Sequence, residues 1–458
     1  MLNPNATKII IAGASGYIGK AVIPKLLQKF PNATITALSR SQQMTDDPRV
    51  QWKACDLFSL KSIETALPES ADLALYLVHS MGPTANLDQG SFADYDLILA
   101  DNFARALSKI NLKQLIYLGG IVPQDKNLSL HLQSRLEVEE TFAQFKLPMT
   151  VFRAGLILGP GGSSFQILLK LVKRLPIMIC PAWTQTLNTP VDLETVLTSL
   201  TEASLNNECI GKIYDLAGCE PITYLQMMRE TAERLGVKRF FFTVPFFTPT
   251  LSRMWVCLIT GTPKDLVYPL VESLEHEMVA RKDRQLLKGS DNKSYKELLE
   301  GVSVKTYSAR SLFQFRARSK TVRSVQRLPL PQGKNADWVK AQYFEWLPRY
   351  LTPFLKVQIF GSSLAFCIFG SKVVLIELKL NTDRSNADRQ LLYIVKGFLV
   401  HAENRGRLEF RVVLNRKYVL AAIHDYQPML PWYVYVYTQA KAHLIVMNSF
   451  RRYLQKQK

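Results

Sequence analysis

Short apolar runs alternate with segments of helical periodicity over the first 155 residues. The first run, Ile9–Ala12, is typical of a strand buried on both faces of a parallel sheet. Lys20–Lys29 then continues with apolar residues at helical spacing, and a second helical segment is predicted at Asp94–Ser108. This alternation predicts an α/β fold with a doubly wound parallel Rossmann sheet. The other runs that we interpret as strands are Ala33–Leu38, Val50–Cys55, Leu73–Val78, Gln114–Leu118 and Leu147–Gly155.

The pattern changes in the last third of the chain, where strand-like runs follow one another without helices between them. Ala336–Leu347 is an amphipathic helix that is expected to end at Pro348, and a long helix is expected at about Pro431–Leu454. This order predicts an α+β helix-grip domain of the START or polyketide-cyclase-like plan, which encloses an apolar cavity between helix and sheet. The strand-like runs are Val357–Phe360, Leu364–Phe369, Val373–Leu380, Leu391–His401, Leu408–Leu414 and Tyr418–His424. The residues of the long helix expected to face the sheet are Trp432, Val436, Ala440, His443, Met447 and Phe450.

Between these two parts we expect a substrate lobe and a connector. Residues 1–300 are predicted to form the nucleotide-binding domain with its substrate lobe, 301–334 a basic linker that carries Pro329 and Pro331, and 335–458 the helix-grip domain. Within the lobe, Gly159–Ser164 is interpreted as a lid or substrate loop, and Glu272–Ala280 is expected to be helical.

The charge is concentrated in the C-terminal third. The chain has a net charge of +19, and residues 301–458 hold 26 Lys and Arg against 8 Asp and Glu. One interpretation is an anionic partner, and the other is a solvated basic surface. The sequence disfavours nucleic acid, because few aromatic side chains that could stack on bases lie beside the charge. An anionic membrane surface is favoured over nucleic acid.

The rest of the composition indicates an ordered protein of the cytoplasm. We expect no transmembrane segment and no signal peptide, because no apolar run reaches the length of a bilayer and the N-terminus enters the first strand directly. The six cysteines are far apart and form no C-x-x-C pair, so we expect neither disulfides nor a metal site.

Glycines at three-residue spacing join the first strand to the first helix. Gly13 allows the tight turn, Gly16 lets a pyrophosphate approach the backbone, and Gly19 lets helix and strand pack closely. The helix start offers free N–H groups and a partial positive charge to phosphates. The turn therefore predicts a dinucleotide site, to which Ser15, Tyr17 and Ile18 also belong. A tight turn without a ligand is the alternative.

The ends of the second and third strands carry the residues that would choose the cofactor. Ser39 and Arg40 stand where an NAD site usually has an acid, and an Arg there suits a 2′-phosphate. The sequence therefore favours NADP and leaves NAD open. Asp56, followed by Leu57, could accept from the adenine amino group or cap the next helix.

Two further strand ends should face the cofactor, because ligands of such sheets bind at the carboxyl ends of the strands. Val78 and His79 end the fourth strand, and Gly119 ends the fifth. A His in this place has either a role in the site or a structural hydrogen bond.

These residues together resemble a known superfamily. Gly13-x-x-Gly16-x-x-Gly19, Asp56-Leu57 and Val151-Phe-Arg-Ala154 are similar to the atypical branch of the short-chain dehydrogenase/reductases (SDRs). Tyr76–Met81, Tyr117–Gly120 and His131–Val138 narrow the resemblance to bacterial NAD(P)-binding proteins that end in a domain of unknown function, DUF2867. The resemblance covers essentially the whole chain.

The chain departs from the superfamily at the catalytic positions that this resemblance implies, a Ser after strand five and a Tyr-x-x-x-Lys. Here Gly119 occupies the first position and His131-x-x-x-Arg135 the second. Arg135 could hold the nicotinamide ribose, and His131 could act as the general acid or base. The alternative is that catalysis has been lost.

The predicted function is therefore an NADP-dependent oxidoreductase that transfers hydride to or from a small apolar or amphipathic carbonyl-type substrate. The alternatives are a non-catalytic NADP(H)-binding redox sensor and a regulatory lipid-binding protein.

Overall fold

A computed structural model describes residues 7–80, 87–125, 127–244, 249–287, 293–305, 321–361, 363–368, 373–401 and 406–457. The chain divides into two compact units. The first unit consists of residues 1–82 and 99–314, and the second of residues 83–98 and 315–458.

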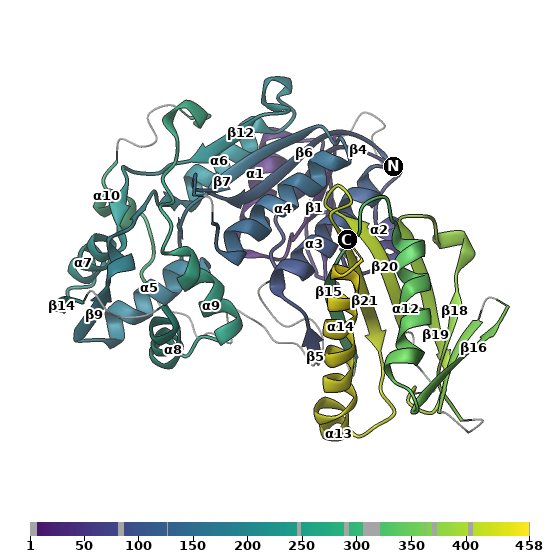
Figure 1. The fold of residues 1–458 in the computed structure, drawn as a ribbon. Coiled ribbons are helices and arrows are strands. Elements are labelled where there is room, and N and C mark those ends of the chain that lie inside the picture. The colour runs from purple at the N-terminus through teal and green to yellow at the C-terminus, as the bar shows by residue number, and fades with distance from the viewer. Residues whose placement is uncertain are drawn as a thin grey trace. The chain divides into compact units, whose positions relative to one another are not determined.

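The first unit is built on a seven-stranded sheet in which all neighbouring strands are parallel (Figure 1). The chain starts at a central strand, moves to one edge and then crosses to the other side of its starting point, which is the doubly wound arrangement that the sequence predicted. The strands in spatial order are β12 (Ile213–Leu216), β7 (Met149–Ala154), β6 (Asn111–Gly120), β4 (Ser70–Tyr76), β1 (Lys8–Ala12), β2 (Thr34–Ser39) and β3 (Val50–Ala54).

Helices cover both faces of this sheet because alternate strand residues point to opposite sides. Ile9 and Ile11 belong to a core with α1 (Tyr17–Lys29) and α6 (Leu193–Ala203). Ile10 belongs to a second core, which includes the helices α2 (Leu60–Ala66), α3 (Phe92–Leu107) and α4 (Leu130–Gln144). Both faces are therefore buried, as the apolar strand runs predicted.

A helical lobe follows the sheet and has its own core. Its helices are α5 (Ser163–Arg174), α7 (Tyr224–Arg234), α8 (Pro249–Thr260), α9 (Lys264–Ser273) and α10 (Tyr295–Glu300). Short strand pairs join them: β8 (Ile157–Leu158) with β11 (Val191–Asp192), β10 (Leu187–Asn188) with β13 (Ile222–Thr223), and β9 (Ile177–Pro181) with β14 (Phe240–Val244).

The prediction of a helix at Glu272–Ala280 is wrong. Helix α9 ends at Ser273, and the chain then takes up an extended pairing with residues 187–189. The N–H of Met278 donates to the carbonyl of Leu187 at 3.0 Å, and the N–H of Thr189 donates to the carbonyl of Met278 at 2.9 Å. These long-range bonds satisfy the backbone without a helix.

The second unit is built on an eight-stranded sheet with helices packed against it. Neighbouring strands are antiparallel except for the last pair, β15 and β5, which is parallel. Each of the six predicted runs contains a strand, but the strand in the run Leu391–His401 ends at Lys396. In spatial order the sheet consists of β16 (Leu355–Phe360), β17 (Ser363–Ile368), β18 (Val374–Leu380), β19 (Arg389–Lys396), β20 (Arg407–Val413), β21 (Tyr418–Tyr426), β15 (Val322–Pro329) and β5 (Leu87–Gln89).

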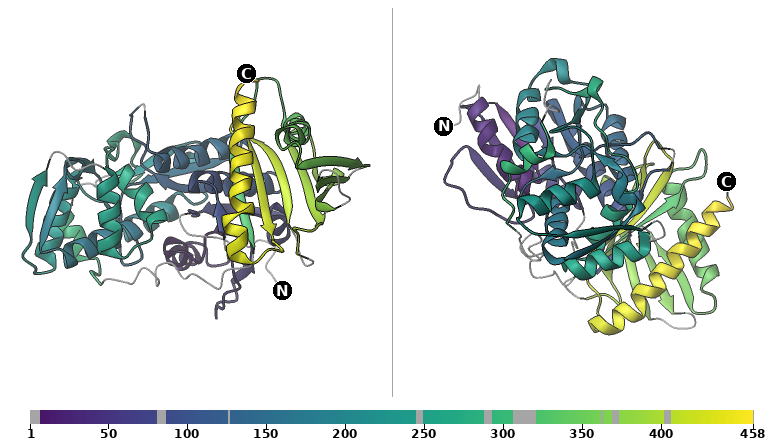
Figure 2. Two further views of the ribbon diagram at one scale, coloured as in Figure 1. Left: turned by 60° about the horizontal axis from the view of Figure 1, so that its bottom comes forward. Right: turned by 90° about the vertical axis from the view of Figure 1, so that its left-hand side faces the viewer.

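Helices α12 (Ala336–Tyr350), α13 (Trp432–Tyr437) and α14 (Gln439–Gln455) contribute to one core with this sheet, and α14 lies along the sheet (Figure 2). Two expectations need correction. Helix α12 continues past Pro348, and the long C-terminal helix breaks at Thr438, whose φ and ψ are −117° and −86°. Of the side chains expected to face the sheet, Ala440, Met447 and Phe450 are buried, and Trp432 and Val436 pack against the same core.

The expected linker 301–334 is a strand over part of its length. Residues 306–320, which hold several of its basic side chains, lie outside the described residues. Residues 322–329 form β15, which pairs with β21 inside the sheet. Its Arg323 pairs with Asp425 at 3.1 Å, and its Arg327 pairs with Asp94 at 2.8 Å. The basic residues therefore have acidic partners that are remote in the sequence.

Two further features concern the cysteines and the length of the helices. All six cysteines are free, and five of them are buried. Of the helices in the described ranges, none is long and apolar enough to cross a membrane.

Candidate functional site

The glycine turn between β1 and α1 has the conformation that the motif predicts. Gly13 has a φ of +84°, and a side chain there would come within 2.7 Å of the carbonyl oxygen of Leu77. The N–H of Gly16 donates to the carbonyl of Gly13 at 2.9 Å. A Cβ on Gly19 would overlap that same carbonyl. Gly13 and Gly19 are therefore required by the geometry of the turn.

Helix α1 begins directly behind this turn and offers a site for an anion. Its N-cap is Gly16, so no side chain caps the first N–H groups, and the first turn has no acidic residue. These N–H groups and the helix dipole favour a negative charge. The turn therefore fits the pyrophosphate of a dinucleotide.

A cavity of about 350 Å³ lies beside the turn. It is lined by the start of α1, the carboxyl ends of β4 and β6, helix α4 and the loop before α5. Nine of the predicted site residues line it: Gly16, Tyr17, Ile18, Gly19, Val78, His79, Gly119, His131 and Arg135. The structure thus brings together residues that the sequence placed on four separate elements.

The other predicted site residues do not line this cavity. Gly13 shapes the turn, and Ser15 is exposed. The side chain of Arg40 is exposed, while the Ser39 hydroxyl donates to the carbonyl of Ser41.

Asp56 and Leu57 follow the third strand and bond to neighbouring segments. The carboxylate of Asp56 accepts the N–H of Phe58 at 3.1 Å. Ser59, rather than Asp56, caps the next helix, so the capping alternative is wrong. The carbonyl of Leu57 accepts from the Asn102 amide at 2.8 Å.

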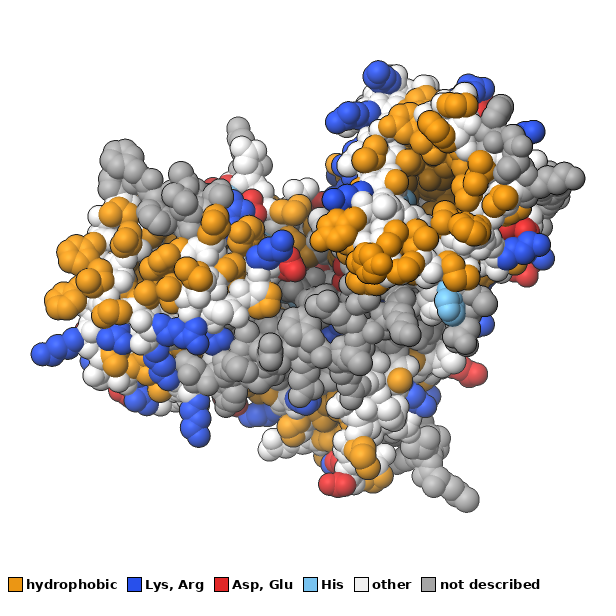
Figure 3. Space-filling view, turned by 90° about the horizontal axis from the view of Figure 1, so that it is seen from below, with side chains coloured by type: hydrophobic (Ala, Val, Ile, Leu, Met, Phe, Trp, Pro, Cys, Tyr) orange, Lys and Arg blue, Asp and Glu red, His pale blue; other side chains and the backbone are white. Residues whose placement is uncertain are grey.

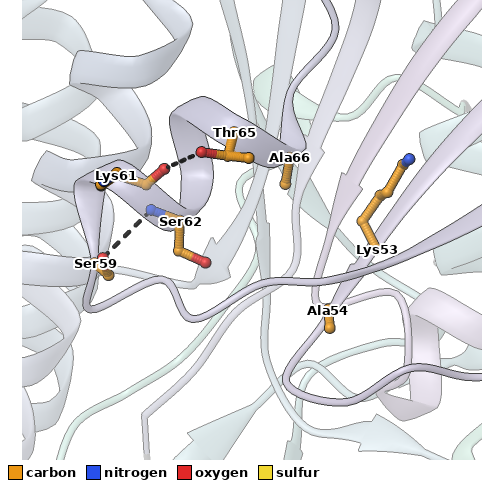
Figure 4. A pocket seen from close by; sticks show the side chains of 7 residues that line it. All are labelled: Lys53, Ala54, Ser59, Lys61, Ser62, Thr65 and Ala66. Carbon is orange, nitrogen blue, oxygen red and sulfur yellow. Dashed lines mark hydrogen bonds between the residues drawn. The ribbon is translucent and has the colours of Figure 1, made fainter.

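A separate hollow of about 530 Å³ lies between the end of β3 and helix α2 (Figure 4). Two hydrogen bonds lie within its wall: the N–H of Ser62 donates to the Ser59 hydroxyl at 3.3 Å, and the Thr65 hydroxyl donates to the carbonyl of Lys61 at 2.9 Å. It shares no lining residue with the cavity beside the glycine turn, so we do not count it as part of the site.

A chain of hydrogen bonds crosses the wall of the 350 Å³ cavity. Arg135 Nη2 lies 2.7 Å from His79 Nδ1, and His79 Nε2 lies 3.2 Å from His131 Nε2. His131 Nδ1 lies 2.9 Å from the hydroxyl of Ser273, and that hydroxyl donates to the carbonyl of Pro269 at 2.9 Å. His131 and Arg135 can act together because residues four apart share one face of α4.

The direction of these bonds follows from the guanidinium, which can only donate. His79 Nδ1 must therefore accept, and a neutral His79 carries its proton on Nε2. That proton is donated to His131 Nε2, so a neutral His131 carries its own proton on Nδ1 and donates it to Ser273. The network thus assigns one tautomer to each ring.

An apolar cavity of about 130 Å³ adjoins the first cavity. Both are lined by Gly120, His131, Ala154, Gly155, Ser164 and Leu270. The remaining wall of the apolar cavity is made by Leu132, Leu156, Ile167, Leu168, Leu171, Trp183, Tyr224, Met228, Val271, Ser273, Leu274 and Met278. His131 therefore lies where the cavity beside the glycine turn meets the apolar cavity.

The glycine-rich loop at 159–162 packs directly on the glycine turn. Side chains on Gly159 or Gly161 would overlap the ring of Tyr17. Gly161 and Gly162 line the 350 Å³ cavity. The loop therefore needs glycine to lie this close to α1.

A buried ion pair fixes the far end of the same face of α4. Glu139 lies one helical turn beyond Arg135, and its carboxylate accepts from Arg153 Nε at 3.0 Å and Nη2 at 2.7 Å. Both side chains are less than a tenth exposed. Burial raises the pKa of the Glu139 carboxyl, although Arg153 opposes this shift.

Sequence reasoning missed the residues that hold His131 from outside its helix. Ser273 lies 142 residues away, and Ser129 joins the same cluster through a contact of 3.1 Å between the two hydroxyls. Ser129 could have been found, because it precedes a helix and caps it. Ser273 gave no local signal.

In the described part of the chain, no group of three or more His, Cys, Asp or Glu could hold a metal ion.

Comparison with known proteins supports the assignment of the first unit. Residues 9–129 match the model of the NAD dependent epimerase/dehydratase family. A segment of 115 residues is 32% identical to the auxiliary protein GraX of Staphylococcus aureus, and this match covers 25% of this chain and 36% of GraX.

Solved structures share the fold at low identity. A nucleoside-diphosphate-sugar epimerase from Staphylococcus aureus is 14% identical with a TM-score of 0.50, over 64% of this chain and 99% of that one. A UDP-glucuronic acid 4-epimerase from Bacillus cereus, solved with UDP-glucuronic acid and NAD, is 15% identical with a TM-score of 0.42, over 59% and 99% of the two chains. The family match and the parallel sheet support an SDR-type Rossmann fold for the first unit.

Proposed function

We propose that this protein is an NAD(P)(H)-dependent oxidoreductase of the SDR type that acts on a small apolar or amphipathic carbonyl-type substrate. The observation that carries the proposal is the position of His131 in the wall shared by the 350 Å³ cavity and the apolar cavity. A bound nicotinamide would supply or accept the hydride.

The residues of the first cavity fit the cofactor. The turn at Gly13–Gly19 and the uncapped start of α1 would hold the pyrophosphate. Arg135 would anchor the nicotinamide ribose, and the exposed Arg40 would pair with a 2′-phosphate, which favours NADP over NAD. NAD, the cofactor in the Bacillus cereus epimerase structure, remains the alternative.

His131 would exchange a proton with the substrate. Ser273 holds its Nδ1 at 2.9 Å, which fixes the ring against the apolar cavity. His79 and Arg135 complete the polar side of the wall. The apolar lining next to His131 suits a substrate whose carbonyl is attached to a hydrocarbon group.

Substitutions on one face of α4 test the catalytic role. We expect His131→Ala to lower NADPH turnover by about 10²–10⁴-fold, since general acid–base catalysis contributes that much, without weakening NADPH binding. The probes are straight-chain aldehydes, ketones and enones, and turnover is followed by NADPH absorbance. Gln133→Ala, an exposed change on the same helix, is the matched control.

Arg135→Lys should weaken NADPH binding, because a lysine loses the planar fork. If both His131→Ala and Arg135→Lys leave turnover unchanged while NADPH still binds, the catalytic claim is refuted and the redox-sensor alternative stands.

The cofactor preference has its own test. Arg40→Glu should weaken NADPH binding by at least roughly tenfold while NADH binding changes little, because only NADPH has a phosphate for this side chain. Lys53→Glu, an exposed charge reversal on the neighbouring strand, is the control. Equal losses for both cofactors would contradict the preference for NADP.

A second candidate function concerns the second unit. The DUF2867 resemblance and the helix-grip order support an amphipathic ligand there, and hydrophobic side chains surround a hollow on the face of this unit at the upper right of Figure 3. Four large apolar side chains of this unit are 60–69% exposed: Phe398, Tyr433, Tyr437 and Ile445.

Native mass spectrometry of the gently purified full chain would show whether such a molecule co-purifies. A lipid-like molecule together with NADP(H) is the expected result. The nucleotide alone would refute this second function.

A further inference from the structure

The pair of strands β9 and β14 presents apolar side chains outward. Ile177 is in register with Phe240, and Ile179 with Phe242. These four side chains are 42–64% exposed, whereas the intervening Met178 and Cys180 are buried. A strand pair on the surface usually places polar residues on its outer face. Apolar residues on both strands therefore indicate an interaction surface.

Helix α8 adds to this surface. Met254 and Leu258, one helical turn apart, are 56% and 79% exposed. Figure 3 shows hydrophobic side chains gathered over this lobe, at the left, with Lys and Arg along one border. We call the four strand side chains, Met254 and Leu258 the lobe patch.

The segments that form the lobe patch are basic and contain no acid. Residues 163–181 hold three Lys or Arg, and residues 238–264 hold four. Lys238 and Arg239 directly precede β14, and Arg239 donates to the carbonyl of Lys173 at 2.9 Å, which brings the end of α5 to the same border. An apolar surface bordered by cations complements an anionic lipid surface.

Apolar walls lead from the lobe patch to His131. Ile179 of the patch lines a small hollow together with Trp255. Leu171, Trp183 and Met228 line both this hollow and the apolar cavity beside His131. The exposed patch and the candidate active site are therefore joined by a continuous set of apolar side chains.

We propose that the first unit docks on an anionic lipid bilayer through the lobe patch, and that its substrate is a hydrocarbon-chain molecule taken from that bilayer. The identity of the substrate rests on the proposed function, whereas the docking does not. The lipid surface is favoured over a protein partner because the cationic border and the inner apolar walls are both explained by lipid.

A fluorescence experiment locates the surface that meets the bilayer. Phe240→Trp adds a tryptophan to the lobe patch, and Met44→Trp adds one at a methionine of the same unit that is 99% exposed. Each full-length variant is mixed with vesicles of equal parts phosphatidylcholine and phosphatidylglycerol, with and without bromine atoms in the acyl chains. Bromine should quench the added fluorescence of Phe240→Trp and leave that of Met44→Trp unchanged. Equal quenching of the two would overturn the proposal.

A loss-of-binding variant separates the patch from the basic second unit. Phe242→Ser and Leu258→Ser should each weaken vesicle binding by roughly tenfold, because each removes a large apolar side chain from the interface. The comparison is made in high salt, where the Debye length falls to roughly 3 Å and long-range attraction is screened. Met44→Ser is the matched control, and NADPH binding verifies the fold.

The outcomes distinguish the two proposals. Vesicle binding by the patch without any NADPH turnover would refute the proposed function and leave the docking intact. Turnover without quenching would refute the docking alone. A patch variant that instead breaks a protein complex while vesicle binding is unchanged would also overturn it.

Discussion

Replacing Arg153 by Met tests whether the buried ion pair under α4 positions the site. His131, Arg135 and Glu139 follow one another at four-residue spacing, so they lie on one face of the helix. Arg153, on β7, makes two charge-assisted hydrogen bonds to Glu139. The substitution keeps an apolar side chain of similar length and leaves a buried carboxylate without either bond.

The expected loss in unfolding free energy is about 3–5 kcal/mol, the usual effect of removing one partner of a buried pair. For a unit of this size, each kcal/mol lowers the melting temperature by about 2–4 °C, so the first unit should melt roughly 6–20 °C lower. The double variant Glu139→Leu with Arg153→Met should recover most of this loss, because an apolar pair of similar volume is often neutral. Calorimetry of the full chain measures the melting temperatures of the wild type, the single variant and the double variant.

The loss should also depend on pH. Burial raises the pKa of Glu139, and removing Arg153 raises it further. An acid whose pKa is higher in the folded state contributes full stability below its unfolded pKa and loses it as the pH rises. The difference in unfolding free energy between the wild type and Arg153→Met should therefore become smaller as the pH is lowered from about 7 to about 5. The reasoning would be refuted if this difference became larger in acid, or if Arg153→Met melted at the same temperature as the wild type.

Three more predictions follow from buried contacts. Gly19→Ala should abolish NADPH binding in a titration calorimeter, because its Cβ overlaps the carbonyl of Gly13. Glu409→Leu should destabilise the second unit by about 3–5 kcal/mol in thermal melts, since it leaves a buried Arg389 without the carboxylate 2.6 Å away. Burial lowers the pKa of His424 to about 4, so stability present above about pH 6.5 should fall as the pH approaches 4, and His424→Gln should flatten this profile.

The inner strands β1, β4 and β7 of the first unit were predictable because they are apolar runs that are buried on both faces. Strand β15 was not predictable, because Arg323 and Arg327 interrupt its apolar pattern. Their partners, Asp425 and Asp94, come from β21 and α3, and no local pattern announces such pairs. The three-residue β5 is likewise defined only by its pairing with β15.

The site was predictable one element at a time. Rules for glycine turns and strand ends placed Gly16 and His79 near a cofactor, and the resemblance to the SDR superfamily placed His131 there. The structure puts all three in one cavity wall. The contact between the two His rings was out of reach because 52 residues separate them. The contact between His131 and the Ser273 hydroxyl could not be predicted from the sequence for the same reason.

The directions of the hydrogen bonds decide which role of His131 the wall favours. In the Tyr-x-x-x-Lys arrangement of the SDR superfamily the cation lowers the pKa of the Tyr, whereas here Arg135 contacts His79 instead of His131. The Arg135 guanidinium donates to His79 Nδ1, so the proton of a neutral His79 lies on Nε2 and is directed at His131 Nε2. A neutral His131 already donates its Nδ1 proton to Ser273, so it can accept a proton only at Nε2, where the N–H of His79 must first be displaced. The neutral wall therefore leaves His131 one proton-accepting atom, Nε2, which acts as the base in the oxidation of an alcohol once the substrate hydroxyl has taken the place of the His79 N–H.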